Sequence, residues 1–222
     1  MTPAVVLFDL DGTLVDTAPD IARALGAAME GTGARPLALE TVKRMVGDGA
    51  RELIRRALAA SPSDAAGEEA VFGRFLASYR ENVCVASQLY PGVVEGLAAL
   101  RADGAALAVV TNKPGDLART LLAALGIGTS FDAIIGDGDG FPRKPDPAAA
   151  LSVLAKVGAS PDRAVVVGDG LPDVRLAHAL GATAVAATWG YVPVAALADE
   201  RPTFLAGSFQ EALSIIRGAP LG

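Results

Sequence analysis

Short apolar runs that alternate with helical patterns constrain the fold of this chain more than any other feature. Five such runs, rich in β-branched residues, occupy residues 5–8, 107–110, 133–135, 164–167 and 184–186. Between the later runs, apolar residues recur at helical spacing at 114–125, 147–157 and 173–180, and each stretch is closed by a glycine. A shorter run at 203–205 precedes a final helical pattern at 209–216. This alternation predicts an α/β fold with a Rossmann-like, doubly wound parallel sheet.

Residues 16–85 interrupt the alternation, because they contain no strand-like run and several stripes of apolar residues at helical spacing. Residues 17–20 fit a capping box with a proline in the first turn of a helix. We therefore expect an all-helical cap domain at 16–85, inserted into a Rossmann-like core made of residues 1–15 and 86–222. A Pro-Gly pair within 87–92 marks the return linker.

Composition excludes several classes of protein. The net charge is −6 and no basic run exceeds two residues, so we expect no nucleic-acid partner and no anionic membrane partner. No apolar segment approaches the roughly 20 residues of a membrane span, and no basic signal region precedes the first run, which favours a cytoplasmic protein. One cysteine and one histidine exclude an internal disulfide and a zinc site.

Polar side chains follow the apolar runs where the predicted strands end. They are Asp9, Asp11, Thr111, Asn112, Lys113, Asp169 and Asp173. Lys144 precedes a predicted helix. Because the carboxyl ends of parallel strands open into one crevice, we expect these groups to converge there.

Two carboxylates as close as Asp9 and Asp11 repel each other unless a cation lies between them or one is protonated. The whole set matches the needs of phosphoryl transfer. A carboxylate can attack phosphorus, a second carboxyl can move the proton, and hard oxygen ligands suit Mg²⁺. A lysine and a threonine can bind the phosphoryl oxygens, where charge accumulates.

The chain resembles the haloacid dehalogenase superfamily of phosphohydrolases in four motifs. These are the segment 9–14, with the sequence Asp-Leu-Asp-Gly-Thr-Leu, then Thr111, Lys144, and Gly168-Asp169 followed by Asp173. The helical insert resembles the cap of that superfamily. Within the superfamily, the chain is similar to the phosphoglycolate phosphatases. The segments that carry this similarity are 47–58, 90–93, 111–114, 143–147 and 189–191.

The resemblance implies a role for each motif residue. Asp9 would attack phosphorus, and Asp11 would act as acid and base. Thr111 would hold the phosphoryl group with help from the backbone of Asn112, and Lys144 would stabilise the nucleophile and the phosphoryl charge.

The implied cofactor is Mg²⁺, held by Asp9, the backbone carbonyl of Asp11, and Asp169. Asp173 would support the metal site or orient Lys144. Two departures from the family pattern are Gly170, where a hydroxyl residue is usual, and the segment 136–142. In that segment the usual acidic position falls on a glycine between Asp137 and Asp139, and the sequence does not decide which of the two acids serves the site.

The implied substrate is a small phosphorylated metabolite, most readily 2-phosphoglycolate. Arg51 or Lys43, from the insert, is the candidate to meet its carboxylate. Alternatives are a phosphatase for a sugar phosphate or pyrophosphate, and a β-phosphoglucomutase-like phosphomutase. A dehalogenase is disfavoured because Asp11 is intact, and a non-catalytic protein because no motif residue is missing. The sequence leaves open whether the protein is a monomer or a homodimer.

Overall fold

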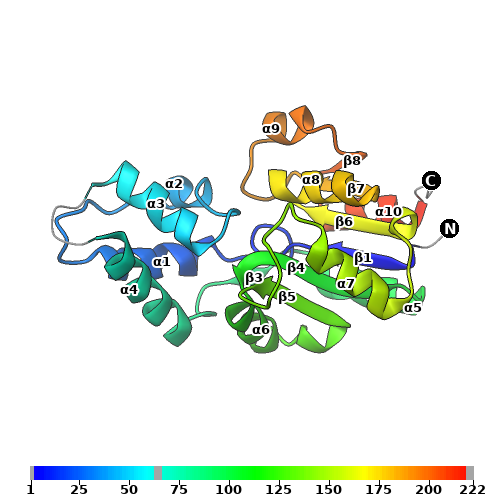
Figure 1. Cartoon of the computed structure of the whole chain (residues 1–222), viewed down its shortest axis with the longest axis horizontal. Coiled ribbons are helices and arrows are strands. Elements are labelled where there is room, and N and C mark those ends of the chain that lie inside the picture. Colours follow the sequence, from blue (N-terminus) through cyan, green and yellow to red (C-terminus); the bar gives the residue numbers. More distant parts are fainter. Residues whose placement is uncertain (1–2, 63–66, 219–222) are drawn as a thin grey trace.

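The computed structural model describes residues 3–62 and 67–218, and its centre is a six-stranded parallel sheet (Figure 1). The strand order is β5-β4-β1-β6-β7-β8. The strands are β1 (Val5–Phe8), β4 (Ala106–Pro114), β5 (Ala133–Asp137), β6 (Ala164–Gly168), β7 (Thr183–Ala187) and β8 (Phe204–Ala206). The chain order reverses at β1, which pairs with β4 on one side and β6 on the other. All six runs predicted from the sequence form strands of this sheet.

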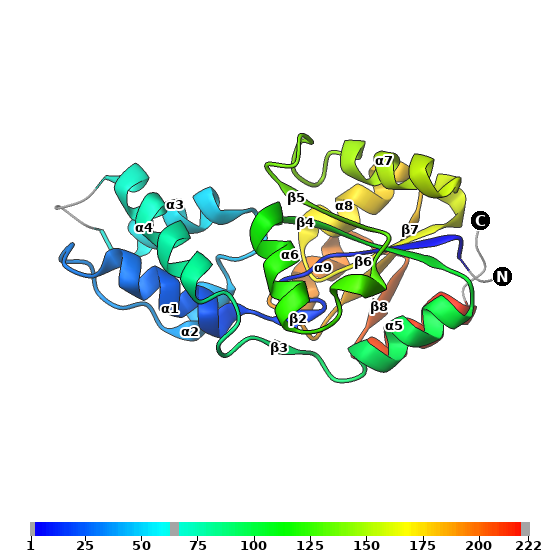
Figure 2. The same ribbon diagram turned by 90° about the horizontal axis from the view of Figure 1, so that it is seen from below.

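Helices cover both faces of the sheet, because successive residues of each strand point to opposite sides. In β1, Val6 and Phe8 join one apolar core, and Val5 and Leu7 join the other. The first face carries α5 (Val93–Ala102), α6 (Gly115–Ala124) and α10 (Phe209–Gly218). The second carries α7 (Ala148–Val157), α8 (Leu171–Leu180) and α9 (Val194–Asp199), and Figure 2 shows α5 and α7 on opposite sides. The predicted α/β doubly wound fold is confirmed, although the sequence pattern did not reveal α5 or α9.

Four further helices lie together at the carboxyl edge of the sheet (Figures 1 and 2). They are α1 (Ala18–Met29), α2 (Leu39–Lys43), α3 (Ala50–Ala60) and α4 (Glu68–Glu81). The chain leaves the sheet through β2 (Val15–Asp16) and returns through β3 (Gln88–Leu89), and these two strands pair antiparallel. The division into a core and a cap domain stays a prediction, and its residues 1–2, 63–66 and 219–222 lie outside the described residues. Within the described ranges, no helix is long and apolar enough to cross a membrane.

The predicted capping box at the start of α1 is wrong. Thr17 precedes the helix, but its side chain makes no cap hydrogen bond. The phenol oxygen of Tyr191 instead accepts hydrogen bonds from the backbone amides of Thr17 and Ala18, at 2.8 and 3.0 Å. The carboxylate of Asp20 accepts hydrogen bonds from the amides of residues 85–87, the return segment through which the chain comes back from α4 to β3. A partner distant in sequence thus replaces the local cap.

Candidate active site

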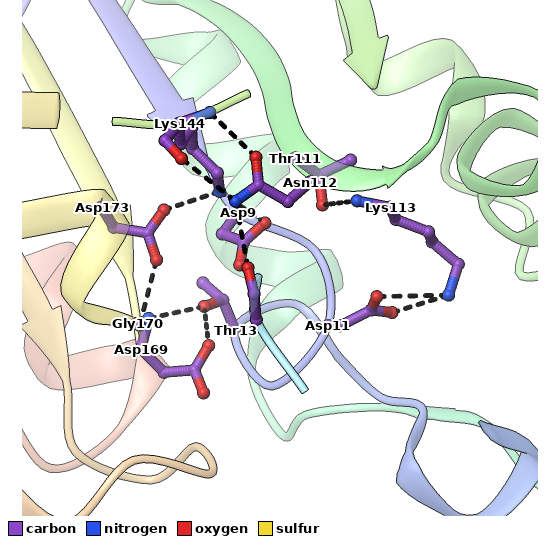
Figure 3. A network of polar contacts seen from close by, with 11 residues as sticks. Asp9, Asp11, Thr13, Thr111, Asn112, Lys113, Lys144, Asp169, Gly170 and Asp173 are labelled. Carbon is purple, nitrogen blue, oxygen red and sulfur yellow. Dashed lines mark hydrogen bonds and ion pairs between the residues drawn. The ribbon is translucent and has the colours of Figure 1, made fainter. Parts of the chain in front are cut away.

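Three buried carboxylates converge beyond the carboxyl ends of β1 and β6. Asp9 directly follows β1, Asp169 directly follows β6, and Asp173 lies in the first turn of α8. One oxygen of each lies within 4.8 Å of one oxygen of the other two (Figure 3). No more than 7% of any of these residues is exposed to solvent. Carboxylates this close in a buried place need a cation beside them, or one of them must hold a proton.

Lys144 supplies one positive charge to this cluster. Its Nζ lies 2.6 Å from Oδ1 of Asp173, to which it donates a hydrogen bond, and 2.7 Å from Oδ1 of Asp9. Burial alone would lower the pKa of Lys144, but the charges of Asp173 and Asp9 outweigh it and raise that pKa. Lys144 is therefore a permanent ammonium at neutral pH, in contact with the carboxylate of Asp9.

Asp169 is oriented by Thr13 and Tyr191, to which the sequence motifs assigned no role. The Thr13 hydroxyl donates to its Oδ1 at 2.8 Å, and the amide of Tyr191 donates to its Oδ2 at 2.8 Å. Two glycines leave room for it: a Cβ atom at Gly12 or at Gly190 would lie 2.3 Å from Oδ2 of Asp169. The Thr13 hydroxyl thus fixes the carboxylate of Asp169 directly, although Gly170 lacks the hydroxyl that is usual in the family.

Gly170 contributes through its backbone. It precedes α8, and its amide donates to Oδ2 of Asp173 at 3.0 Å. The carboxylate of Asp173 is therefore held between this amide and the Lys144 ammonium.

The donor set of the cluster fits a hard divalent cation. Burial, followed by the charge of Asp9, raises the pKa of Asp169 to about 8. Burial also raises the pKa of Asp173, against the opposing charge of Lys144. Oδ1 of Asp9 is buried and accepts no hydrogen bond, since the nearby Lys144 amine meets it without hydrogen-bond alignment. Several oxygen ligands that repel one another, with one of them unsatisfied, are what Mg²⁺ or a similar ion would bind.

Asp11 lies on the other side of Asp9 from Asp169 and has a different partner (Figure 3). Nζ of Lys113 donates to both carboxylate oxygens of Asp11, at 2.9 and 3.2 Å, and to the hydroxyl of Tyr79 at 2.6 Å. The side chain of Lys113 is 2% exposed. Burial tends to lower the pKa of Lys113, but Asp11 and Tyr79 raise it well above its usual range, so this amine is also an ammonium.

A widened bulge in β4 presents Thr111, Asn112 and Lys113 to the site. Val110 pairs with Ile135 and Pro114 with Asp137, so four steps along β4 oppose two along β5. Oδ1 of Asn112 accepts from the amide of Lys144 at 2.9 Å, and its Nδ2 donates to the carbonyl of Gly47 at 3.0 Å. The Asn112 side chain thus links the sheet to the loop before α3.

A small cavity of about 40 Å³ of water-accessible volume opens between the polar side chains at the edge of the sheet and helices α1–α4, called the helical segment below. Polar side chains on its wall belong to Asp9, Asp11, Tyr79, Thr111, Asn112 and Lys113. The apolar side chains come mostly from the helical segment and are Ile21, Val46, Ala50, Leu53, Phe75, Pro114 and Leu117. Gly47 and Gly49 complete the wall. The loop before α3 therefore lies over the site.

The structure does not bring Arg51 or Lys43 to this cavity. Arg51 pairs with Glu69 at 2.7 Å, and its guanidinium lies 4.2 Å from the centre of the Phe72 ring. Lys43 pairs with Glu40 at 3.0 Å. Neither cation belongs to the cavity wall, because α2 and α3 bury their apolar stripes and leave these two positions outside the packed faces.

The two acids left open by the sequence also lie apart from the carboxylate cluster. Asp137 pairs with Arg143 at 3.2 Å, and Asp139 pairs with Arg119 at 2.7 Å. Neither belongs to the group of acids whose oxygens converge.

Sequence reasoning gave no role to four residues that shape the site, namely Thr13, Tyr79, Lys113 and Tyr191. Lys113 carried a signal, because it follows a predicted strand at the same edge as the acids. Thr13 lies within the first motif and also could have been found. Tyr191 lies in the segment 189–191 that resembles the phosphoglycolate phosphatases, but the resemblance gave it no role. Tyr79 gave no signal, since an aromatic residue in an apolar stripe is usually a packing residue.

Comparison with known proteins agrees with this geometry. The haloacid dehalogenase-like hydrolase family matches residues 3–181. The chain belongs to this family. Phosphoglycolate phosphatase 1 of Pseudomonas aeruginosa is 40% identical over 216 residues, which cover 95% of this chain and 79% of that protein. The phosphoglycolate phosphatase of Nitrosococcus oceani is 37% identical, and the match covers 98% of each chain.

Solved structures of the haloacid dehalogenase-like family share the whole architecture. The crystal structure of a predicted phosphoglycolate phosphatase from Haemophilus somnus 129pt superposes with a TM-score of 0.90. It is 32% identical and covers 97% of this chain and 98% of its own. The predicted superfamily membership is therefore confirmed, and so is the hydrolase class.

Proposed function

We propose that this hydrolase is a Mg²⁺-dependent phosphomonoesterase that acts through an aspartyl-phosphate on Asp9, with 2-phosphoglycolate as its substrate. The observation that carries the proposal is the position of Asp9 between two separate charge systems. On one side lie Lys144, Asp169 and Asp173, and on the other lies Asp11 with Lys113.

Asp9 is suited to attack phosphorus. Its carboxylate lies on the cavity wall, and the Lys144 ammonium lies 2.7 Å from its Oδ1. Thr111 lies on the same wall and can donate to a phosphoryl oxygen. When bound, Mg²⁺ would neutralise charge on the phosphoryl oxygens, and Asp9, Asp169 and the carbonyl of Asp11 would hold it, with Asp173 in support.

Asp11 is placed to move the proton. Its carboxyl lines the cavity beside Asp9 and can give a proton to the leaving oxygen as the ester bond breaks. The same group, then ionised, can take a proton from the water that attacks the phosphorus of the aspartyl-phosphate and releases Asp9. Lys113 holds both oxygens of Asp11 and so fixes its orientation in both steps.

The choice of substrate is supported by the relatives and by the size of the site. Relatives at about 40% identity bear the name phosphoglycolate phosphatase. A cavity of about 40 Å³ holds only a few water molecules and so favours a small leaving group over a sugar.

The test is release of inorganic phosphate from a panel of phosphomonoesters in the presence of Mg²⁺, with 2-phosphoglycolate, glucose phosphates and pyrophosphate included. We expect the highest kcat/KM for 2-phosphoglycolate. Asp9→Asn should abolish turnover while the circular dichroism spectrum stays unchanged. Conversion of a sugar phosphate to its isomer without phosphate release would favour a phosphomutase, and release from no member would refute the proposal.

A further inference from the structure

The ammonium of Lys113 lies in the wall of the active-site cavity. Among the described residues that form this wall, no other is a lysine or an arginine. The two cations that the sequence suggested for the substrate, Arg51 and Lys43, pair with surface acids instead. Lys113 is also buried, with 2% of its side chain exposed.

Burying an ammonium carries a solvation cost of several kcal/mol unless partners compensate it. Asp11 and Tyr79 do so here, because their oxygens accept hydrogen bonds from Nζ at 2.6 to 3.2 Å and the centre of the Tyr79 ring lies 4.4 Å from Nζ. Tyr79 belongs to α4, so the amine bridges the sheet and the helical segment at the place where a leaving group would lie. The neighbouring walls from Leu53, Phe75 and Leu117 are apolar and offer a leaving group no other charge partner.

The distances bring this amine within reach of a specific part of a substrate. A leaving oxygen that receives a proton from Asp11 lies about 2.7 Å from its carboxyl. Nζ of Lys113 is 2.9 Å from one oxygen of that carboxyl and 3.2 Å from the other. The amine and the leaving oxygen are therefore at most about 6 Å apart. A carboxylate on the carbon next to that oxygen extends about 3 Å toward the amine, which leaves about a hydrogen-bond length between them.

We propose that Lys113 binds a carboxylate on the leaving group and thereby selects 2-phosphoglycolate and similar α-carboxylated phosphomonoesters. The inference rests on the proposed phosphomonoesterase function and names the residue that sets its specificity. Lys113 exchanges part of its contact with Asp11 for the carboxylate of the substrate. When the leaving group is neutral or cationic, the amine of Lys113 keeps only Asp11 and Tyr79 as partners, and the substrate gains no ion pair with it.

The experiment compares two substrates of similar size, 2-phosphoglycolate and ethyl phosphate, in wild type, Lys113→Met and Lys113→Gln. The readout is the ratio of kcat/KM for the carboxylated substrate to kcat/KM for the neutral one. Loss of a hydrogen bond to a charged group should lower this ratio by about 10- to 100-fold. Lys156→Met is the matched control, because Nζ of Lys156 is bound to the carbonyl of Asp132 at the surface, and it should leave the ratio unchanged.

The two-substrate ratio separates specificity from a merely structural role. If Lys113 only orients Asp11, both substrates lose the same factor and the ratio stays constant, which overturns the inference. Lys113→Gln keeps polar contacts to Asp11 and Tyr79 and gives the measurement if Lys113→Met does not fold. A wild type that hydrolyses both esters equally also overturns the inference while the phosphatase function stands. A wild type that hydrolyses no phosphomonoester refutes the proposed function itself.

Discussion

Replacing Asp20 by asparagine should destabilise the protein by about 2 kcal/mol at pH 7, and the loss should fade at low pH. Asp20 is fully buried in α1, and Oδ2 accepts bonds from the amides of Val85, Ala86 and Ser87 and from the Ser87 hydroxyl, all at 2.7–3.0 Å. Burial alone raises the pKa of Asp20, but the bonds from Ser87, Arg23 and the amides outweigh it and lower the pKa to about 2.

The size and sign of the effect follow from linkage. The ordinary pKa of the group is 3.8, so a folded-state value of about 2 corresponds to about 2 kcal/mol, at 1.36 kcal/mol per unit. Because the folded-state pKa is lowered, the stabilisation is complete well above pH 3.8 and is lost as the pH falls toward 2. At pH 3 about half of it should remain. An amide at this position also points N–H groups at backbone donors, which adds to the loss at neutral pH.

Urea unfolding of wild type and Asp20→Asn at pH 7, 5, 4 and 3 measures the difference directly. Asp162→Asn serves as the matched control, because Asp162 is exposed and should show a difference near zero at each pH. A wild-type advantage that stays constant from pH 7 to pH 3 would refute the reasoning. So would an Asp20→Asn variant as stable as wild type at pH 7, since the return segment at 85–87 would then not depend on this carboxylate.

Three further outcomes follow from the site. Mg²⁺ should raise the melting temperature more at pH 8 than at pH 6. The pKa of Asp169 is raised to about 8, so at pH 6 the ion must displace a proton from this carboxyl. Asp169→Asn should remove most of the increase in melting temperature. Gly190→Ala should lower kcat/KM by at least about 100-fold, since its Cβ would lie 2.3 Å from Asp169, whereas Gly26→Ala, with no atom within 4 Å, should not. Arg51→Ala should change kcat/KM for 2-phosphoglycolate by less than about 2-fold, because its partner is the surface residue Glu69; a large rise in KM would instead place Arg51 at the substrate.

Local patterns accounted for most of the sheet and for the elements that carry the motifs. The apolar runs that became β1, β4, β6 and β7 were visible because a strand buried on both faces needs apolar residues throughout. Helix α5 was missed, since its stripe directly follows a Pro-Gly turn and resembles a continuation of the linker. The capping box was wrong, because Asp20 found buried amides at 85–87 that compete with its own helix.

The sequence by itself determined the class of chemistry. Asp9, Asp11, Lys144 and Asp169 follow strands or precede helices that a parallel sheet must bring to one edge, so their convergence follows from topology. Which partner each would take was decided only by tertiary structure. Contacts such as Lys113 with Asp11 and Tyr79 join positions 102 and 34 residues apart in the chain, and no local pattern encodes them. For the same reason the helical segment could be recognised from its apolar stripes, while the sequence could not decide which of Lys113, Arg51 and Lys43 lines the active-site cavity. The residue is Lys113, which lies on the bulge of β4 and is buried against Asp11. Arg51, on the helices, pairs with Glu69 at the surface instead.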